Sequence, residues 1–190
     1  LLIGMMIIVG ITRQSGVFEY IAVKSAKIAG GQPLTILIAL SIITALLSAF
    51  LDNVTTVLLI VPVTFAITDR LKVSPVPFLF AEIICSNIGG TATLIGDPPN
   101  IMIGSATGLG FLDFIVNLGL PVLIILLVTL AIMVLWFRKE LVTGRDEIQA
   151  VMKMEEHELI KDWRLMKQSL TVLGLVIVLF FLHQALHMES

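Results

Sequence analysis

The stretch Ser48-Ala49-Phe50-Leu51-Asp52-Asn53-Val54-Thr55-Thr56 places an acid and an amide in the middle of an apolar run that extends over residues 34–68. Residues 34–51 and 54–68 would be about 27 and 22 Å long as helices, at 1.5 Å per residue. One continuous helix over 34–68 would be much longer than the roughly 30 Å hydrocarbon core of a bilayer. The sequence therefore predicts a helical hairpin over 34–68, with Asp52-Asn53 at its tip.

The composition of the whole chain indicates whether this hairpin lies in water or in a membrane. Of the 190 residues, 57% are hydrophobic and 14% are charged, and the mean hydropathy is +1.05. Soluble domains are roughly 45–50% apolar and about 25% charged. This excess excludes a soluble enzyme, a disordered chain and a nucleic-acid binder, and the net charge of -2 points to no polyanionic partner. The chain is predicted to be an all-α polytopic integral membrane protein, and its single cysteine, Cys85, excludes an internal disulfide.

A second polar stretch, residues 86–100, interrupts the next apolar region. Residues 76–114 are too many for one straight span, and Gly89-Gly90 and Gly96-Asp97-Pro98-Pro99 divide them, so they predict a broken transmembrane helix. Residues 116–137 form an uncharged run that would be about 33 Å long as a helix, and they predict a complete span.

The remaining segments are distinguished by their charges. Residues 17–29 alternate apolar side chains with lysines, which predicts a helix lying in the membrane interface, or alternatively a short connecting loop. Residues 138–168 carry most of the charges of the chain and predict a solvated, partly helical linker. Residues 169–190 predict a further span, and residues 1–11 the end of a span whose beginning is missing, so we expect a fragment without its N-terminus.

The distribution of basic residues gives an orientation. Arg13, Lys24 and Lys27 precede the hairpin and Arg70 and Lys72 follow it, so both of its ends are expected on the positive side and the hairpin is re-entrant. One crossing by 76–114 and a return by 116–137 then place the linker 138–168 on that same, cytoplasmic side. We therefore expect a multi-pass protein of a plasma or inner membrane.

The polar residues at membrane depth are the candidates for function. A charged group at the bilayer centre costs on the order of 2.5–3.5 kcal/mol, and irregular backbone is tolerated there only inside protein or beside a watery cavity. Two such interruptions predict a shared polar cavity. The candidate substrate- and ion-binding residues are Asp52, Asn53, Thr55, Asn87, Gly89, Gly90, Thr91, Thr93, Asp97 and Asn100.

The local chemistry suggests roles for these residues. Asp52 or Asn53 and Asp97 can cap the helices that follow them, and the N–H groups at such helix starts suit an anion. Backbone carbonyls freed by the glycines suit a hard cation, so a Na+ site is predicted at Asp52, Asn53 and Gly89. Asp52 is either a cation ligand or a proton carrier.

Each role has a structural alternative. Asp97 would then only cap a helix, and Gly89-Gly90 would only permit close helix packing. The hydroxyls of Thr55, Thr56, Thr91 and Thr93 would only bond to their own helices. Glu82 is either a functional acid or an acid at the cytoplasmic edge. His183 and His187 are expected at the membrane edge and not as a ligand pair.

The stretches SAFLDNVTTVLLIVPVT (48–64) and SNIGGTATLIGDPPNIMI (86–103) resemble the ion transporter superfamily of arsenite permeases, NhaD-type Na+/H+ antiporters, citrate and dicarboxylate symporters and the P protein. The resemblance implies two inverted repeats, each with a re-entrant hairpin and a broken helix whose tips meet near the midplane. Residues 1–137 would be the first repeat, 138–168 the linker and 169–190 the first helix of a missing second repeat. Asp52-Asn53-Val54 would occupy the place of Ser-Asn-Thr in the dicarboxylate symporters, and Gly89, Gly90 and Thr91 would face it.

The function implied is secondary transport of an arsenite-like or carboxylate-like anion, coupled to H+ or Na+. The alternatives are a Na+/H+ antiporter of the same fold and a membrane subunit or scaffold that transports nothing. No nucleophile–base pair, P-loop or zinc-binding histidine pair is present, so an enzyme is not expected, and no cofactor is expected beyond the coupling ion. The expected partners are the lipid bilayer, a small ion, the missing second half and, as an open alternative, a second copy in a homodimer.

Overall fold

The computed structural model describes residues 2–185, and within the two terminal helices it describes the side chains of residues 4, 7–14 and 163–179. All of the regular secondary structure in this part of the chain is helical, which confirms the predicted all-α class. The side chain of His183 and the whole of His187 lie outside the described part.

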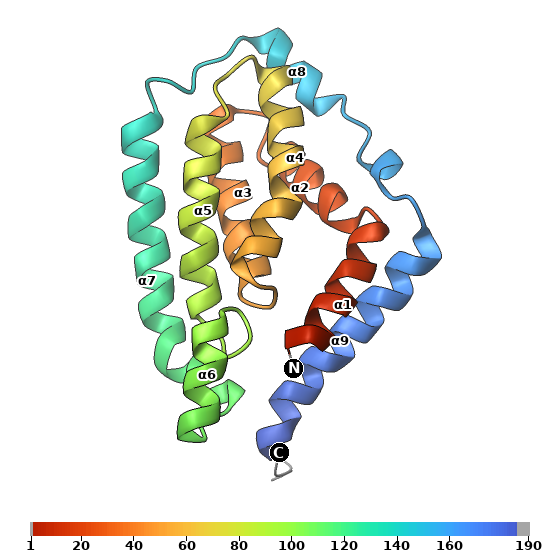
Figure 1. Cartoon of the computed structure of the whole chain (residues 1–190). Helices are drawn as coiled ribbons and strands as arrows, with labels where there is room; N and C mark the ends of the chain where they lie inside the picture. The colour runs from red at the N-terminus through yellow and green to blue at the C-terminus, as the bar shows by residue number, and fades with distance from the viewer. Residues whose placement is uncertain (1, 186–190) are drawn as a thin grey trace.

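The hairpin consists of α3 (Pro33–Ser48) and α4 (Asn53–Leu71), joined by residues 49–52. A proline at its first position starts α3, where the missing N–H costs nothing. The two helices run in opposite directions, and α5 (Val76–Thr91) packs against both (Figure 1). By its length of 19 residues and its apolar composition, α4 is able to cross a membrane.

The broken helix consists of α5, an irregular segment at 92–97, and α6 (Pro98–Thr107), and α7 (Phe111–Phe137) follows it. Two predicted boundaries are therefore wrong, because the broken helix ends before 114 and the next span begins before 116. Gly108, with a φ of 74°, ends α6 in the left-handed conformation. The Asp113 carboxylate then accepts a hydrogen bond of 2.8 Å from the Gly110 N–H, which fixes the start of α7.

The N-terminal part forms α1 (Leu2–Gln14) and α2 (Val17–Ile28). A helix is present where an interfacial helix was predicted, but its apolar face is covered by protein. Phe18, Ala22 and Val23 are at most 2% exposed, and α2 packs against α3 and α4. The amphipathic pattern therefore reflects burial within the molecule and does not require a lipid surface.

The linker is more ordered than predicted. It contains α8 (Arg145–Met152) and the short 3₁₀ helix η1 (Glu156–Leu159), and it leads into α9 (Trp163–Ala185). The last helix begins before the predicted residue 169 because Asp162 caps it, its Oδ1 accepting from the N–H groups of Arg164 and Leu165 at 2.8 and 3.0 Å. Val151 is fully buried, α8 packs against α4, and α9 lies along α1 (Figure 1).

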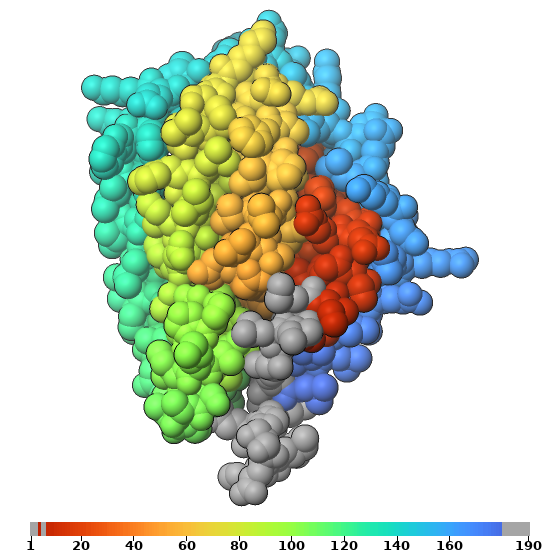
Figure 2. Space-filling model, viewed as in Figure 1, coloured from red at the N-terminus to blue at the C-terminus, as the bar shows by residue number. Residues whose placement is uncertain are grey.

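The hydrophobic core lies where α2, α3, α4 and α5 meet. Its residues include Ile36 and Leu37 of α3, Ile60 and Ile67 of α4, and Phe78 of α5, each at most 1% exposed. The outer faces of the helices are apolar as well. In the most apolar 18-residue stretch of α7, only 11% of the residues are buried inside the molecule. Figure 2 shows α4, α5 and α6 side by side on one such face. An apolar exterior of this extent is typical of a protein surrounded by lipid.

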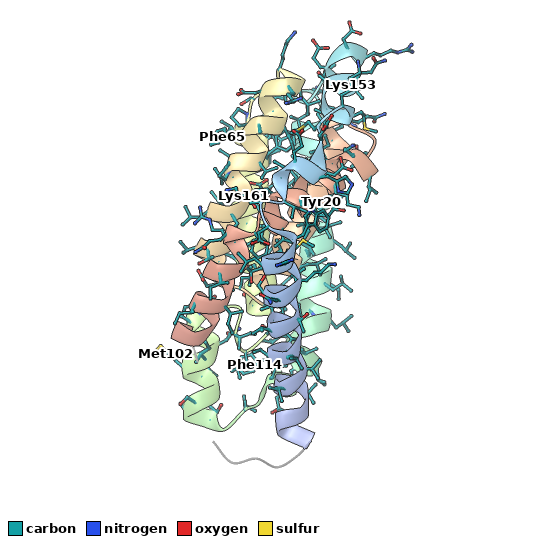
Figure 3. All side chains as sticks on the ribbon, turned by 90° about the vertical axis from the view of Figure 1, so that its right-hand side faces the viewer. Tyr20, Phe65, Met102, Phe114, Lys153 and Lys161 are labelled. Atoms are coloured by element: carbon teal, nitrogen blue, oxygen red, sulfur yellow. The ribbon has the colours of Figure 1, made fainter. Side chains whose placement is uncertain are left out.

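The two ends of the molecule differ in the elements that form them. The linker covers one end, where Lys153 projects, and α6 with Met102 lies toward the other (Figure 3). The tip of the α3–α4 hairpin points from the linker end toward α6 (Figure 1). The tip is therefore held inside the length of the molecule, beside the break between α5 and α6.

Candidate functional site

Asp52 holds the start of α4. Its backbone is extended, with φ -69° and ψ 154°, and its side-chain Oδ1 accepts a hydrogen bond of 2.8 Å from the Thr55 N–H. This geometry is the usual N-cap, and the negative charge interacts favourably with the helix dipole. The structure thus confirms the predicted capping role of Asp52, and it assigns the Thr55 backbone to the same cap.

Asn53 connects the hairpin to the broken helix. Its Nδ2 donates to Asn87 Oδ1 at 3.0 Å, and its Oδ1 accepts from the Ser48 hydroxyl at 3.5 Å. One amide at the start of α4 therefore contacts both the end of α3 and the last turns of α5. The two polar stretches of the sequence meet at this point. Ser48 was missed as a candidate, although it belongs to the same polar stretch.

Asn87 and Thr91 lie on the exposed side of α5. Asn87 Nδ2 donates to the Ile83 carbonyl at 2.8 Å, and Thr91 Oγ1 donates to the Asn87 carbonyl at 2.8 Å. The structural alternative is therefore correct for the Thr91 hydroxyl, which bonds within its own helix. The Asn87 amide serves both its own helix and Asn53.

The two adjacent glycines are required for different reasons. A Cβ on Gly89 would lie 2.0 Å from the Ala45 carbonyl oxygen, so this glycine lets α3 and α5 touch backbone to backbone. A Cβ on Gly90 would lie 2.5 Å from Asn53 Oδ1, so this glycine leaves room for the bridging amide. The Gly89 carbonyl accepts from the Ala92 N–H at 3.0 Å. Close packing is thus the interpretation that the geometry of Gly89 supports.

Two side chains hold the irregular segment after α5. The Thr93 hydroxyl donates to the Ala49 carbonyl in the hairpin tip and accepts from the Gly96 N–H, and Thr93 lies outside α5, so the expected bond within a helix is absent. Asn100, which is 8% exposed, directs its Nδ2 at the carbonyls of Thr93 and Thr91, at 2.8 and 3.1 Å. Of the glycine carbonyls that we expected to be free for a cation, that of Gly90 lies 3.5 Å from Asn100 Nδ2, and that of Gly89 accepts from the Ala92 N–H.

Asp97 stands at the N-cap position of α6 but does not cap it with its side chain. The next two residues, Pro98 and Pro99, have no N–H, and the Asn100 N–H donates to the Asp97 backbone carbonyl at 3.0 Å. The predicted capping role is wrong for this reason. For the same reason the start of α6 offers few N–H groups to an anion. At the start of α4 the N–H groups of Thr55 and Thr56 donate to Asp52, and those of Asn53 and Val54 have no hydrogen bond among the described residues.

Glu82 lies one to two turns from the tip along α5 and is 1% exposed. The Thr64 hydroxyl of α4 donates to its Oε1 at 2.5 Å. The side chain points into the helix interface and not toward the surface of the molecule, which is the position of a buried acid. An acid inside an apolar helix was the only signal that the sequence offered.

The comparisons with known proteins agree with the fold. Residues 1–190 match the family described as citrate transporter. The chain is 50% identical over 189 residues to an uncharacterized transporter of Mycobacterium tuberculosis, a match that covers 100% of this chain and 44% of that protein. It is 48% identical over 188 residues to a 46 kDa membrane protein of Mycobacterium leprae, a match that covers 98% of this chain and 44% of that protein. It is 40% identical over 177 residues to the P protein of Homo sapiens, a match that covers 90% of this chain and 21% of that protein. The chain spans less than half the length of these relatives, and it belongs to the citrate transporter family.

Proposed function

We propose that the protein containing this chain is a secondary active transporter of a small anion, organic or inorganic, driven by H+ or Na+. The observation that carries the proposal is the contact between the hairpin tip and the helix break through Asn53 and Asn87. Hairpin tips and broken helices that meet near the midplane are a recurrent way of building an ion site in a transporter. A matching second repeat, from the rest of the protein, would complete the site.

The start of α4 is the part of this site suited to an anion. Of its first four N–H groups, those of Thr55 and Thr56 donate to Asp52, so those of Asn53 and Val54 remain for an anion, with the side-chain amide of Asn53 beside them. The Asp52 carboxylate at the same helix start would repel a bound anion. Two unit charges 4 Å apart interact by about 4 kcal/mol at an effective dielectric constant of 20. A cation bound at Asp52 removes this repulsion, so anion and cation would bind together.

The proposal is tested with the full-length protein in liposomes carrying an imposed H+ or Na+ gradient, with labelled citrate and other small anions as substrates. Asp52→Asn keeps an equally good N-cap and removes the charge. We expect wild-type protein to accumulate an anion and the variant to lose gradient-driven uptake on the order of tenfold, the effect of about 1.4 kcal/mol of lost cation binding. The matched control is Asp146→Asn on the exposed surface of α8, which we expect to transport normally.

The outcomes separate the alternatives. Normal gradient-driven uptake by Asp52→Asn would refute the role of this carboxylate. Na+-driven proton flux by wild-type protein without any added anion would identify a Na+/H+ antiporter, for which the carboxylate of Asp52 at the hairpin tip is the favouring observation. A protein that moves no ion, and that tolerates alanine at Asn53 and Asn87, would be a scaffold.

A further inference from the structure

Glu82 is a buried acid that the hairpin-tip site does not use. Its Oε1 accepts from Thr64, and its Oε2 is buried without a hydrogen-bond partner among the described residues. The ion pairs found in the described part of the chain do not include it. An unpaired carboxylate inside protein costs several kcal/mol. A carboxyl group in this position is stable only when a proton or a cation accompanies it.

The helices packed against α5 bring no charge to Glu82. The sequence of α3 contains no charged residue, and the charged residues of α4, Asp69 and Arg70, are exposed near its end. Beside α5, α7 contributes Leu130 and Met133, and its one acid, Asp113, lies about 25 Å away along the helix. On α5 itself the nearest titratable group is Cys85, beside Ser41.

A stripe of buried hydroxyls extends from Glu82 to the hairpin tip. The parallel helices α3 and α5 are in register, since Ser41 lies beside Cys85 and Ala45 meets Gly89. Along this interface and the adjoining face of α4 lie polar side chains that are all at most 1% exposed. We call them the hydroxyl stripe: Ser41, Thr44, Ser48, Thr56, Thr64 and Ser86.

Half of the hydroxyl stripe has no oxygen or nitrogen hydrogen-bond partner among the described residues. The oxygens of Thr44 and Thr56 are buried and unpaired, and the oxygen of Ser41 has only the weakly bonding thiol of Cys85 beside it. Each such group costs about 1–3 kcal/mol, and in a native protein it calls for an explanation such as water or a transported ion. The stripe ends at Ser48, whose hydroxyl bonds to Asn53 in the tip. The unpaired groups therefore lie between Glu82 and the proposed transport site.

We propose that Glu82 binds the coupling proton of the transporter and that the hydroxyl stripe connects it to the hairpin tip. The proposal rests on the proposed transport function. One proton joins the carboxylate from one side of the membrane and leaves to the other, and no electrons move. A hard cation needs several oxygen ligands, whereas Glu82 has a single hydroxyl within hydrogen-bond distance. No group of three or more His, Cys, Asp or Glu side chains that could hold a metal occurs among the residues described.

The first test uses Glu82→Gln in the full-length protein in liposomes. We expect the variant to keep exchange of labelled for unlabelled substrate, which requires no net proton movement. Accumulation driven by a pH gradient should fall on the order of tenfold, the effect of about 1.4 kcal/mol. The matched control is Glu19→Gln, because Glu19 also has a buried, unpaired oxygen but lies on α2, outside the stripe. We expect Glu19→Gln to keep both activities.

The result distinguishes this proposal from the proposed function. If Glu82→Gln accumulates substrate like the wild type, Glu82 is only structural and the inference is overturned, while the transport function stands. If wild-type protein transports no anion, the proposed function fails, and the second test decides the role of Glu82.

The second test needs neither a variant nor transport. Dicyclohexylcarbodiimide reacts with protonated carboxyl groups in apolar surroundings, and mass spectrometry locates the product. In the wild-type protein we expect labelling of Glu82 that declines as the pH rises, and none of exposed Glu155 in the linker. Absence of labelling at Glu82 at every pH would overturn the proposal. Labelling that Na+ suppresses at constant pH would also overturn it, because the site would then bind a cation in place of a proton.

Discussion

Gly89 has no room for a side chain where α3 crosses α5. Its added Cβ would lie 2.0 Å from the Ala45 carbonyl oxygen and 2.6 Å from the Ala45 Cα. Backbone cannot move aside as a flexible side chain can, so Gly89→Ala must push the hairpin away from α5. Overpacking of this kind typically costs about 1–3 kcal/mol. We expect a lower thermal unfolding temperature for the full-length variant in detergent, together with weaker transport.

Gly174 in α9 provides the control for this substitution. Nothing lies within 4 Å of its added Cβ, so alanine there only removes a flexible residue from a helix. Gly174→Ala should be neutral or stabilising by up to about 1 kcal/mol. Equal unfolding temperatures for Gly89→Ala and the wild type would mean that α3 and α5 do not touch as closely as described.

The roles of single residues were predictable from sequence where they depend on neighbours in the chain. Asp52 caps the helix that follows it, as expected for an acid at that position. Asp97 fails to do so, and the two prolines after it were already a sufficient reason. Thr93 and Asn100 bond to groups whose position depends on the fold, so no local pattern could identify their partners.

The presence of a helix was predictable from the sequence where polar residues end an apolar run. The hairpin and the broken helix follow from this rule, because polar backbone in lipid must find a partner. The starts of α7 and α9 were placed too late, since they depend on the single side-chain bonds made by Asp113 and Asp162. The amphipathic pattern of α2 identified a helix but could not tell whether protein or lipid covers its apolar face.

The linker is fastened to the helices by ion pairs that respond to pH. Lys27 Nζ lies 2.5 Å from Glu156 Oε2, and Lys27 also donates to the Met154 carbonyl. The hydrogen bond from Lys27 lowers the pKa of Glu156 below its ordinary value of 4.5. A lowered pKa means that this contact stabilises docking above pH 4.5 and is lost as the pH falls through the lowered folded value. Hydrogen exchange in residues 153–162 should therefore accelerate in acid, after correction for the intrinsic rate.

Glu156→Gln should remove this acid-induced loosening while leaving the linker more mobile at neutral pH. Glu155→Gln is the control, because Glu155 is exposed and forms no ion pair among the described residues. High salt should act on wild-type protein in the same direction as acid, since it screens partly exposed charges. Protection that is equal at every pH would show that apolar contacts such as Val151 hold the linker alone.

At the scale of the whole molecule, the sequence indicated that two distant polar stretches belong together before any contact was visible. The reason is energetic, because polar groups inside an apolar solvent are retained only where they satisfy one another or line a wet cavity. The structure brings Asn53 within 3.0 Å of Asn87, as that requirement demands. The sequence could not predict which hydroxyls between the helices lack a hydrogen bond, because their pairing depends on the rotation and register of the helices.

We expect the molecule to cross the membrane with its linker end on the cytoplasmic side. Lys153 projects at the linker end, and α6 lies toward the opposite end (Figure 3). Basic loops remain on the cytoplasmic side, so a cysteine at position 153 should react with an impermeant maleimide only from the cytoplasm. A cysteine in place of exposed Leu109, between α6 and α7, should react only from the other side. The native Cys85 is fully buried and should give little background.

Labelling of both positions from one side would mean that α7 does not cross the membrane. The hairpin tip and the helix break would then have no second compartment to serve. Labelling from opposite sides would instead leave the α3–α4 hairpin entering and leaving on the linker side, with its tip beside the break (Figure 1). The proposed site would then be separated from one compartment by the hairpin and from the other by α6. That arrangement is the barrier on both sides that a transporter must open alternately.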